Sequence, residues 1–321
     1  MKKYLLIFLL LLAQSNFLIA SQSNSDVMAS NIAIVIHGGA GWSRNQTEEK
    51  LKSIEDGLKR ALDEGFAILE SGRTSLDAVE AAVVILEDDV TFNAGKGSVY
   101  TAEEKQEMDA SIMTGELQNA GAVASVSTIK NPIKLARYVM EKTEHVLIVG
   151  QGAEKVAIKG GLEVVDPSYF YSKEKLDRVR RQKTKDELST VGAVAIDKDG
   201  NISAATSTGG RSNKLPGRVG DSPIIGAGTW AQNNLCGVSG TGHGEYFMRF
   251  NVAREICARI DYLGLTADQA SNQVINELSE MGIEGGVIVM DKEGSASMIF
   301  NTDGMARAYK NSNGDEIVTI Y

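Results

Sequence analysis

Hydroxyl side chains gather at three places in the sequence where strands are expected to begin or end. Thr190 opens the stretch TVGAVAID, residues 206–208 close the stretch ISAATST, and Thr241 lies in a glycine-rich turn, SGTGHGE, before an expected helix. A threonine hydroxyl is a weak nucleophile unless a base lies beside it, and a free chain N-terminus can be that base. Its α-amino group has a pKa of about 8, so a fraction is unprotonated at neutral pH. Thr190 could therefore be both nucleophile and base if the bond between Ser189 and Thr190 were cut.

The segment that precedes Thr190 has the composition expected of a cleavable linker. Most residues from 173 to 187 are charged, and both signs are mixed. A solvated helix would also have this composition, but only Leu176 and Val179 could anchor such a helix on the protein. The segment can therefore bury little apolar surface. We expect residues of about 166–189 to include an exposed, mobile linker that ends at the cleavage site.

Composition and missing motifs argue against several other chemistries. The formal net charge of −9 makes a nucleic-acid partner improbable, because such a protein needs a surplus of Lys and Arg on its binding face. The three histidines, His37, His145 and His243, do not have zinc-site spacing. No G-x-S-x-G nucleophile motif follows HGGAG, and GTGHGE lacks the lysine of a P-loop. Of the chemistries considered, catalysis by a side-chain hydroxyl group remains. The sequence does not point to an organic cofactor.

The N-terminal residues 1–20 have the layout of a secretory signal peptide. Two lysines precede an apolar run from Tyr4 to Ala13, which is about half of the roughly 20 residues that span a bilayer. We expect cleavage after Ala20 and export to the periplasm or the outside of the cell. The mature form is not expected to lie in a membrane.

The mature chain keeps two cysteines, Cys236 and Cys257. An oxidising compartment would permit a disulfide between them, but two cysteines in a large domain do not make a disulfide framework. We therefore expect buried free thiols.

The elements that must position these residues alternate between strands and helices. Residues 31–41 are expected to form a buried strand that runs into a glycine-rich turn, and two helical patterns follow over 47–70 and 74–89. The stretch TVGAVAIDKDGNISAATST predicts a hairpin with an Asp-Lys-Asp-Gly-Asn turn, and GGVIVMDKEGSASMIFN repeats its design. Hairpins separated by pairs of helices predict an α+β fold in which stacked sheets lie between helical layers.

Several motifs together resemble one known family. IHGGAG, LEDDVTFNAGKGSVYT, MDASIM, TVGAVAID, ATSTGG, NKLPGRVGDSP and SGTGHGE are similar, in this order, to the isoaspartyl peptidase/L-asparaginase family, the plant-type asparaginases among N-terminal nucleophile hydrolases. The resemblance covers nearly all of the chain after the signal peptide. It implies a four-layer αββα sandwich and self-cleavage between Ser189 and Thr190. Two subunits, residues 21–189 and 190–321, would remain associated in one domain.

The resemblance also implies a role for individual residues. Arg218 would bind the α-carboxylate of L-asparagine or a β-aspartyl dipeptide, and Asp221 would bind its α-ammonium. Thr241 and Gly242 would donate hydrogen bonds to the tetrahedral oxyanion, and Thr208 would orient the nucleophile. The other positions that the motifs place near the substrate are Val219, Gly220, His243, Gly244 and Asn93.

Two further expectations follow from the same resemblance. LEDDVTFNAGKG resembles the family's sodium loop, and carbonyl-rich loops suit hard cations. Two cleaved pairs would form a dimer, which is a heterotetramer. Ser189 stands where relatives commonly have Gly or Asp, a difference that bears on the rate of maturation. The backbone carbonyls that would hold a structural Na⁺ belong to Leu86, Glu87, Asp89, Phe92, Ala94 and Lys96.

Three other functions remain open at this point. A glycosylasparaginase or a threonine aspartase would use the same nucleophile on a different substrate. An exported binding protein could keep the fold without cutting. That last protein would give one band on a denaturing gel, whereas a self-cleaving hydrolase would give two.

Overall fold

The computed structural model describes residues 31–181 and 190–321. The expected signal peptide over 1–20 and Ser189 of the expected cleavage bond lie outside the described residues. Among the helices that the structure describes, none is long and apolar enough to cross a membrane.

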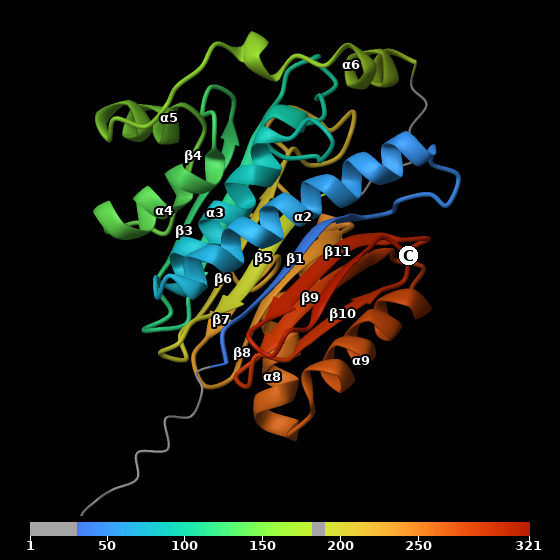
Figure 1. Ribbon diagram of the computed structural model, residues 1–321. Coiled ribbons are helices and arrows are strands. Elements are labelled where there is room, and N and C mark those ends of the chain that lie inside the picture. The colour runs from blue at the N-terminus through green and yellow to red at the C-terminus, as the bar shows by residue number, and fades with distance from the viewer. Residues whose placement is uncertain (1–30, 182–189) are drawn as a thin grey trace, which may run out of the picture. The chain divides into compact units, whose positions relative to one another are not determined.

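The larger of two β-sheets has eight strands, and β1, β5 and β6 lie near its middle (Figure 1). Neighbouring strands are antiparallel except for the last pair, β3 and β4, which is parallel. The middle strands are buried throughout because both faces of the sheet are covered. In spatial order the strands are β12 (Glu316–Thr319), β11 (Met305–Asn311), β1 (Ala33–Ala40), β5 (Val191–Ile196), β6 (Ile202–Thr208), β2 (Met108–Thr114), β3 (Ala120–Val126) and β4 (Leu147–Val149).

A second, four-stranded antiparallel sheet packs against the first. Apolar side chains from both sheets, such as Val194 of β5 and Ile288 of β9, fill the space between them. This inner core fixes the two sheets face to face. The strands of the second sheet are β10 (Ala296–Phe300), β9 (Gly285–Asp291), β8 (Cys236–Gly242) and β7 (Thr229–Gln232).

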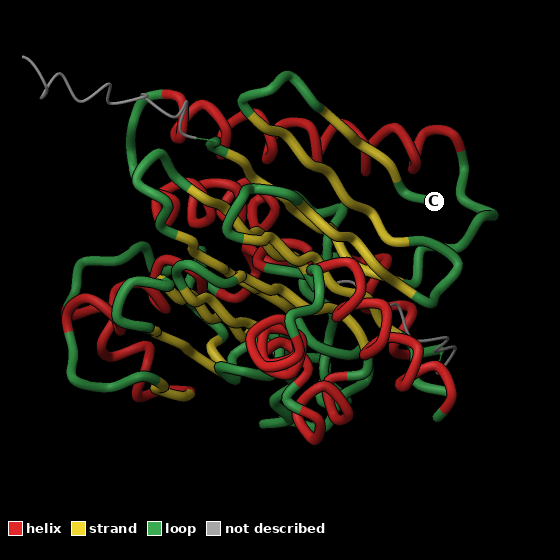
Figure 2. Tube along the Cα trace, turned by 90° about the horizontal axis from the view of Figure 1, so that it is seen from below, coloured by secondary structure: helices red, strands yellow, loops and turns green. Residues whose placement is uncertain are grey.

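Helices cover the outer face of each sheet. Helices α2, α3, α4 and α5 pack on the eight-stranded sheet, and α8 and α9 pack on the four-stranded one. Figure 2 shows the strands side by side, flanked by helices. The expected α+β fold with αββα layers is therefore confirmed. The helical elements are α2 (Glu48–Glu70), α3 (Ser75–Asp88), η1 (Gly95–Gly97), α4 (Pro132–Lys142), α5 (Gly150–Lys159), η2 (Pro167–Phe170), α6 (Lys173–Arg180), α7 (Gly244–Phe250), α8 (Val252–Leu263) and α9 (Ala267–Glu280).

Threonine residues cap the N-termini of helices α2 and α3. The hydroxyl of Thr47 accepts a hydrogen bond from the backbone N–H of Lys50, and the hydroxyl of Thr74 accepts one from Asp77. Each threonine thereby satisfies a backbone donor that has no partner within its helix. The buried residues of α2 recur at intervals of three and four, so one face of this helix lies on the sheet.

The segment before the expected cleavage site differs from the mobile linker that its composition suggested. Residues 173–180 form helix α6, whose Leu176 and Val179 pack against Tyr100 in a small apolar cluster. Two apolar residues three positions apart lie on one face of a helix, and here that face contacts the protein. The remainder of the charged run lies outside the described residues.

The expectation of free thiols is also wrong. Cys236 is the first residue of β8 and Cys257 lies in α8, and the two form a disulfide with Cα atoms 6.0 Å apart. Helix α8 packs directly on β8, so the fold brings together two cysteines that are well separated in sequence. The sequence pattern contains no signal for that contact.

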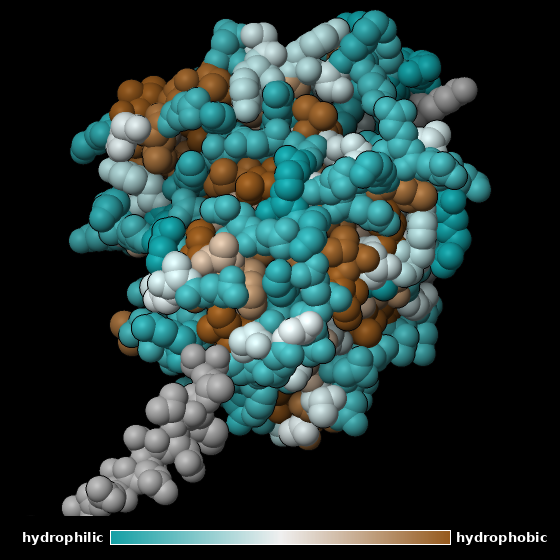
Figure 3. Space-filling view, in the orientation of Figure 1, coloured by the Kyte–Doolittle hydropathy of each residue, from teal (hydrophilic) through white to brown (hydrophobic). Residues whose placement is uncertain are grey.

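Exposed apolar side chains gather at one edge of the larger sheet. Val146, Leu147 and Val149 are each at least 41% exposed at β4, and Ile158 of α5 is 65% exposed. Figure 3 shows brown surface over this region, at the upper left, in contrast with the mostly polar surface around it.

Candidate active site

The site is centred on a pair of threonines at the open end of the β5–β6 hairpin. Thr190 directly precedes β5 and is 8% exposed, and Thr208 is the last residue of β6. Val191 pairs with Ser207 across the hairpin, so the two threonines lie opposite each other. The Thr190 hydroxyl donates a hydrogen bond to Thr208 Oγ1 at 3.1 Å. The hairpin therefore holds the candidate nucleophile against a second hydroxyl.

Thr241 lies at the same end of the sandwich as Thr190. His37 of β1 pairs with Gly192 of β5, and the two strands are antiparallel, so the end of β1 lies beside the start of β5. Ala40, at the end of β1, donates its backbone N–H to Thr241 Oγ1 at 3.3 Å. Thr241 and Gly242 are the last residues of β8 rather than part of a turn.

Arg218 and Asp221 converge on Gly244. A Cβ atom placed on Gly244 would lie 2.7 Å from Asp221 Oδ1 and 3.0 Å from Arg218 Nη2. A Cβ on Gly210 would lie 3.4 Å from Arg218 Nη1, and the Gly210 N–H donates to Thr208 Oγ1 at 2.9 Å. Glycine at these positions lets the backbone lie close to Arg218, and Gly210 lies close to Lys214 as well.

Three other expected substrate-contact positions lie next to Arg218, Asp221 and Gly244 in the sequence. Val219 and Gly220 connect Arg218 to Asp221, and Gly220 is buried directly against the guanidinium. His243 precedes helix α7, and its Nδ1 accepts a hydrogen bond from the backbone of Glu284 at 3.3 Å.

Asp221 has an unusual electrostatic environment. It is 4% exposed, and its Oδ2 has no hydrogen-bond partner among the described residues. Burial raises the pKa of Asp221 to about 7, and the charge of Arg218 offsets only part of that effect. A buried carboxylate oxygen without a partner would be stabilised by a ligand ammonium.

Glu245 is a site residue that the sequence patterns did not single out. It lies in the first turn of α7, and its Oε1 accepts a hydrogen bond from Arg218 Nε at 2.9 Å. Arg211 approaches the other carboxylate oxygen at 3.6 Å. Glu245 therefore fixes the orientation of the Arg218 guanidinium. Its position directly after TGHG was the available signal.

A buried chain of hydroxyl groups was missed as well. Ser239 Oγ lies 2.9 Å from His37 Nε2 and 2.7 Å from Thr206 Oγ1, which in turn accepts a hydrogen bond from Thr229 at 2.6 Å. Burial lowers the pKa of His37 to about 3, although a backbone hydrogen bond with Thr190 acts in the opposite direction. The imidazole is therefore neutral, and the chain ties the two sheets together beside the start of β5.

Asn93 holds a loop behind the threonine pair. Its Nδ2 donates to the carbonyl of Gly210 at 2.7 Å, and its Oδ1 accepts from the backbone of Val99 at 3.0 Å. The Gly209 N–H donates to the Asn93 carbonyl at 2.9 Å. Asn93 thus supports the turn that follows Thr208.

Backbone carbonyl oxygens converge in the same loop, and one of them, that of Phe92, also accepts a hydrogen bond from Lys175 Nζ at 3.3 Å. A Cβ on Gly97 would collide with the carbonyl oxygen of Phe92 and lie 3.1 Å from that of Asp89. A Cβ on Gly95 would collide with the carbonyl of Glu87, in the last turn of α3, where backbone carbonyls lack helical partners. Converging neutral oxygens fit Na⁺. The same segment of chain also contains Leu86, Ala94 and Lys96.

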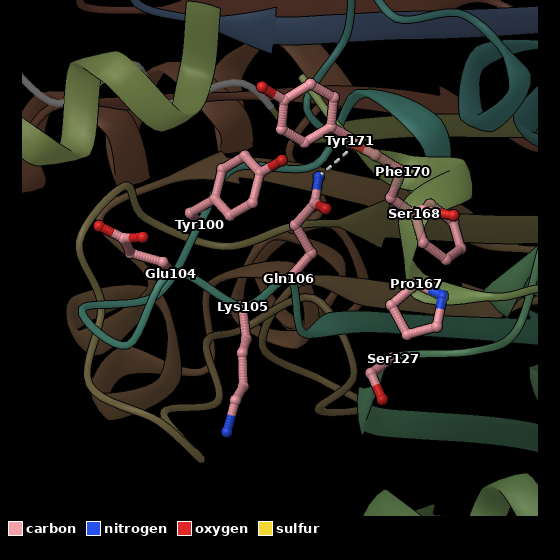
Figure 4. A pocket seen from close by; sticks show the side chains of 9 residues that line it. All are labelled: Tyr100, Glu104, Lys105, Gln106, Ser127, Pro167, Ser168, Phe170 and Tyr171. Carbon is pink, nitrogen blue, oxygen red and sulfur yellow. Dashed lines mark hydrogen bonds between the residues drawn. The ribbon is translucent and has the colours of Figure 1, made fainter. Parts of the chain in front are cut away.

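A separate cavity of about 440 Å³ lies near helix α6. Figure 4 shows its lining, in which the Gln106 side chain points toward Phe170. Gln106 Nε2 donates to the Phe170 carbonyl at 2.7 Å and to that of Ser98 at 2.8 Å. Thr190, Arg218 and Asp221 do not line this cavity. Its full lining is Tyr100, Glu104, Lys105, Gln106, Ser127, Pro167, Ser168, Phe170 and Tyr171.

Comparison with known proteins agrees with the motif order. The chain is similar to the isoaspartyl peptidase of Escherichia coli (strain K12), with 44% identity over 307 residues that cover 90% of this chain and 95% of that protein. It is 39% identical over 285 residues to the isoaspartyl peptidase/L-asparaginase of Bos taurus, covering 86% and 92% of the two chains. A family model described as asparaginase matches residues 30–320. The chain therefore belongs to the asparaginase family.

Proposed function

We propose that this protein is a self-cleaving amidohydrolase that hydrolyses β-aspartyl dipeptides and L-asparagine and releases L-aspartate. The observation that carries the proposal is the hydrogen bond from Thr190 to Thr208 at the start of β5, next to the Arg218 and Asp221 pair. Family membership and the printed names of the relatives support the same activity.

Maturation would begin with the Thr190 hydroxyl. Its oxygen attacks the carbonyl carbon of Ser189, the peptide nitrogen leaves, and an ester joins Ser189 to Thr190 Oγ1. The hydroxyl proton passes to the leaving nitrogen, which becomes the Thr190 α-amino group. Water then hydrolyses the ester, which frees the Ser189 carboxylate and regenerates the Thr190 hydroxyl. The near-complete burial of Thr190 supports this step, because a buried hydroxyl is held in one orientation.

The new α-amino group would then serve as the base for hydrolysis. It accepts the hydroxyl proton while Thr190 Oγ1 attacks the side-chain carbonyl of the substrate. Collapse of the tetrahedral intermediate releases ammonia from asparagine, or the amine of the second residue from a dipeptide. Water hydrolyses the resulting ester and releases aspartate. Thr208 would orient Oγ1 in both steps.

The remaining residues would bind the substrate and its transition state. Arg218 suits the planar α-carboxylate, because its guanidinium presents paired donors. Asp221 suits the α-ammonium through its unpaired Oδ2. Thr241 Oγ1 and the Gly242 N–H would donate to the oxyanion, where one donor contributes roughly 3–4 kcal/mol in comparable sites.

Three wider parts of the proposal rest on the sequence and the family. The carbonyls of the 86–96 loop would hold a structural Na⁺. Two cleaved pairs would form a dimer, which light scattering would test through the mass in solution. The protein would be exported after removal of residues 1–20, which fractionation of the producing cells would test.

The substrate is tested by incubating purified protein with L-asparagine, a β-aspartyl dipeptide and glycosyl-asparagine. The proposal predicts turnover of the first two and two bands on a denaturing gel. Turnover of glycosyl-asparagine alone would identify a glycosylasparaginase. A single band with substrate binding but no turnover would identify a binding protein.

A further inference from the structure

Lys175 of helix α6 reaches into the loop that supports the threonine pair. Its ammonium lies 3.3 Å from the carbonyl oxygen of Val90 and 3.3 Å from that of Phe92, and it also contacts the carbonyl of Gly97. A lysine ammonium has three N–H donors and no acceptor, so a set of three carbonyls can satisfy all of them. The side chain thus gathers oxygens from both ends of residues 90–97.

This loop is linked to Thr190 by a short series of hydrogen bonds. Asn93, inside the loop, binds both Gly209 and Gly210. The Gly210 N–H binds Thr208 Oγ1, which accepts the bond from Thr190. Every link is between 2.7 and 3.1 Å long. A shift of the loop would therefore reach the nucleophile through few intermediates.

Helix α6 has other attachments that do not depend on Lys175. Leu176 and Val179 pack on Tyr100. Arg180 forms a two-point ion pair with Glu104, at 2.7 and 2.6 Å. These contacts should keep the helix docked when the ammonium is removed, so the function of Lys175 can be tested in a folded protein.

We infer that Lys175 is a positioning residue, which holds loop 90–97 against the turn that follows Thr208. The first subunit would thereby support the nucleophile of the second subunit after the chain is cut. The catalytic part of this inference rests on the proposed function of Thr190. The structural part, that Lys175 orders the loop, does not.

Lys173 provides a matched control for Lys175, because both lysines lie on α6 and either substitution removes one positive charge. Lys173 lies on the same helix, is 76% exposed, and pairs only with Asp177 among the contacts described for it. Lys175→Met keeps the length of the side chain and removes its ammonium, and Lys173→Met makes the same change where no carbonyls converge. Lys175→Arg restores a cation at the original position.

The structural part is tested by amide hydrogen exchange in uncut chains that carry Thr190→Ala. Lys175→Met should raise the exchange of peptides that cover 90–98 and 208–210 about tenfold, and Lys173→Met should leave it unchanged. Equal protection in the two variants would overturn the inference, whether or not Thr190 is a nucleophile.

The catalytic part is tested in chains that retain Thr190. Lys175→Met should slow self-cleavage and lower kcat, each about tenfold, because small displacements of a nucleophile are costly. KM should change less than twofold, because Arg218 and Asp221 keep their contacts, and Lys175→Arg should recover part of kcat. If exchange rises in the loop while cleavage and kcat stay normal, Lys175 does not position the nucleophile and the inference fails.

A cation added from solution provides an independent readout. In Lys175→Ala, ammonium chloride should raise the melting temperature more than tetramethylammonium chloride at equal concentration, because only ammonium can donate to the carbonyls. With sodium chloride kept constant in every sample, so that a sodium site in the loop stays filled, Lys173→Ala should respond equally to both salts. An equal response of Lys175→Ala to both salts would show that the carbonyls of Val90, Phe92 and Gly97 do not bind a cation together. That result would overturn the inference.

Discussion

The molecule contains two hairpins of the same local design, and only one of them carries the site. Each turns at an aspartate that accepts backbone hydrogen bonds. Asp197 Oδ1 binds the N–H groups of Asp199 and Asn201, both at 3.0 Å. Asp291 Oδ1 binds two backbone N–H groups in the same relative positions, at 3.0 and 2.8 Å. The turns therefore do not explain why only the β5–β6 hairpin carries candidate catalytic residues.

The difference lies at the open ends. The β5–β6 hairpin ends in Thr190 and Thr208, whose hydroxyls are hydrogen bonded. The β9–β10 hairpin begins at Gly285 and ends at Phe300, and a Cβ on Gly285 would lie 2.7 Å from the Phe247 ring. One end holds the candidate nucleophile in a hydrogen bond, and the other end is filled by packed side chains.

Position in the sheets adds to the contrast. Strands β5 and β6 lie in the middle of the eight-stranded sheet, whereas β10 is an edge strand of the smaller sheet. A strand with neighbours on both sides has little freedom to shift. A reactive side chain at its end is consequently held more firmly than one beside an edge.

The largest expected effect comes from removing the reactive end itself. Thr190→Ala should give one uncut chain and lower turnover by at least about 10⁴-fold, because nucleophile and base are lost together. Ser297→Ala removes a buried hydroxyl from β10 and should leave cleavage complete. A gel and a turnover assay of both variants would check this. A Thr190→Ala protein that is cut, or that turns over normally, would refute the nucleophile assignment.

The next effect tests the hydroxyl pair. Thr208→Val keeps the shape of the side chain but removes the partner of Thr190, and kcat should fall about 10²-fold. KM should change little, because Thr208 is not expected to contact the substrate. Thr208→Ser retains the hydroxyl and should keep most of kcat. Equal activity of the valine and serine variants would show that the hydrogen bond does not orient the nucleophile.

The two turns should differ moderately in stability. Asp197 Oδ2 also accepts the backbone N–H of Ser75 at 2.9 Å, which ties its hairpin to the start of α3. Asp197→Ala should therefore lower the free energy of unfolding by about 1–2 kcal/mol more than Asp291→Ala. Urea unfolding of uncut Thr190→Ala chains would measure both values. A larger loss from Asp291→Ala would contradict the comparison.

The smallest expected effect, over one pH unit, is a pH dependence of ligand binding at Asp221. The pKa of Asp221 is raised to about 7, so the carboxylate is increasingly neutral below that pH. Binding of L-aspartate, whose ammonium needs the ionised carboxylate, should weaken about tenfold per pH unit below about 7 and strengthen as pH rises through it.

The control for that measurement is succinate, which lacks the ammonium group. Its affinity should not improve as pH rises through about 7, and Asp221→Asn should remove the pH dependence for L-aspartate. Calorimetric titration of the mature protein would check each case. A pH profile that is the same for aspartate and succinate would show that Asp221 does not bind the ammonium.

The sequence alone was sufficient for the hairpins, the capped helices and the layered fold. Alternating small and β-branched residues around an Asp-Gly turn determine β5–β6 locally, and Thr47 and Thr74 mark the helix starts locally. The motif order predicts Thr190, Arg218 and Asp221 as site residues from the sequence alone. These features depend on residues near one another in the chain.

The features that sequence reasoning missed depend on contacts between distant segments. The disulfide arises because α8 packs on β8, and helix α6 is stable because Tyr100 meets its two apolar residues. Glu245 gains its role only when α7 is brought to Arg218. No local pattern indicates the contact between the cysteines or between α6 and Tyr100, and for Glu245 the only local signal was its position directly after TGHG.

The central claim is that the chain becomes reactive by cutting before Thr190. The most direct test is N-terminal sequencing and intact mass measurement of the purified protein. We expect a smaller piece that begins Thr-Val-Gly-Ala-Val and ends at Tyr321. An active protein that consists of one uncut chain, or whose smaller piece begins at another residue, would contradict the account.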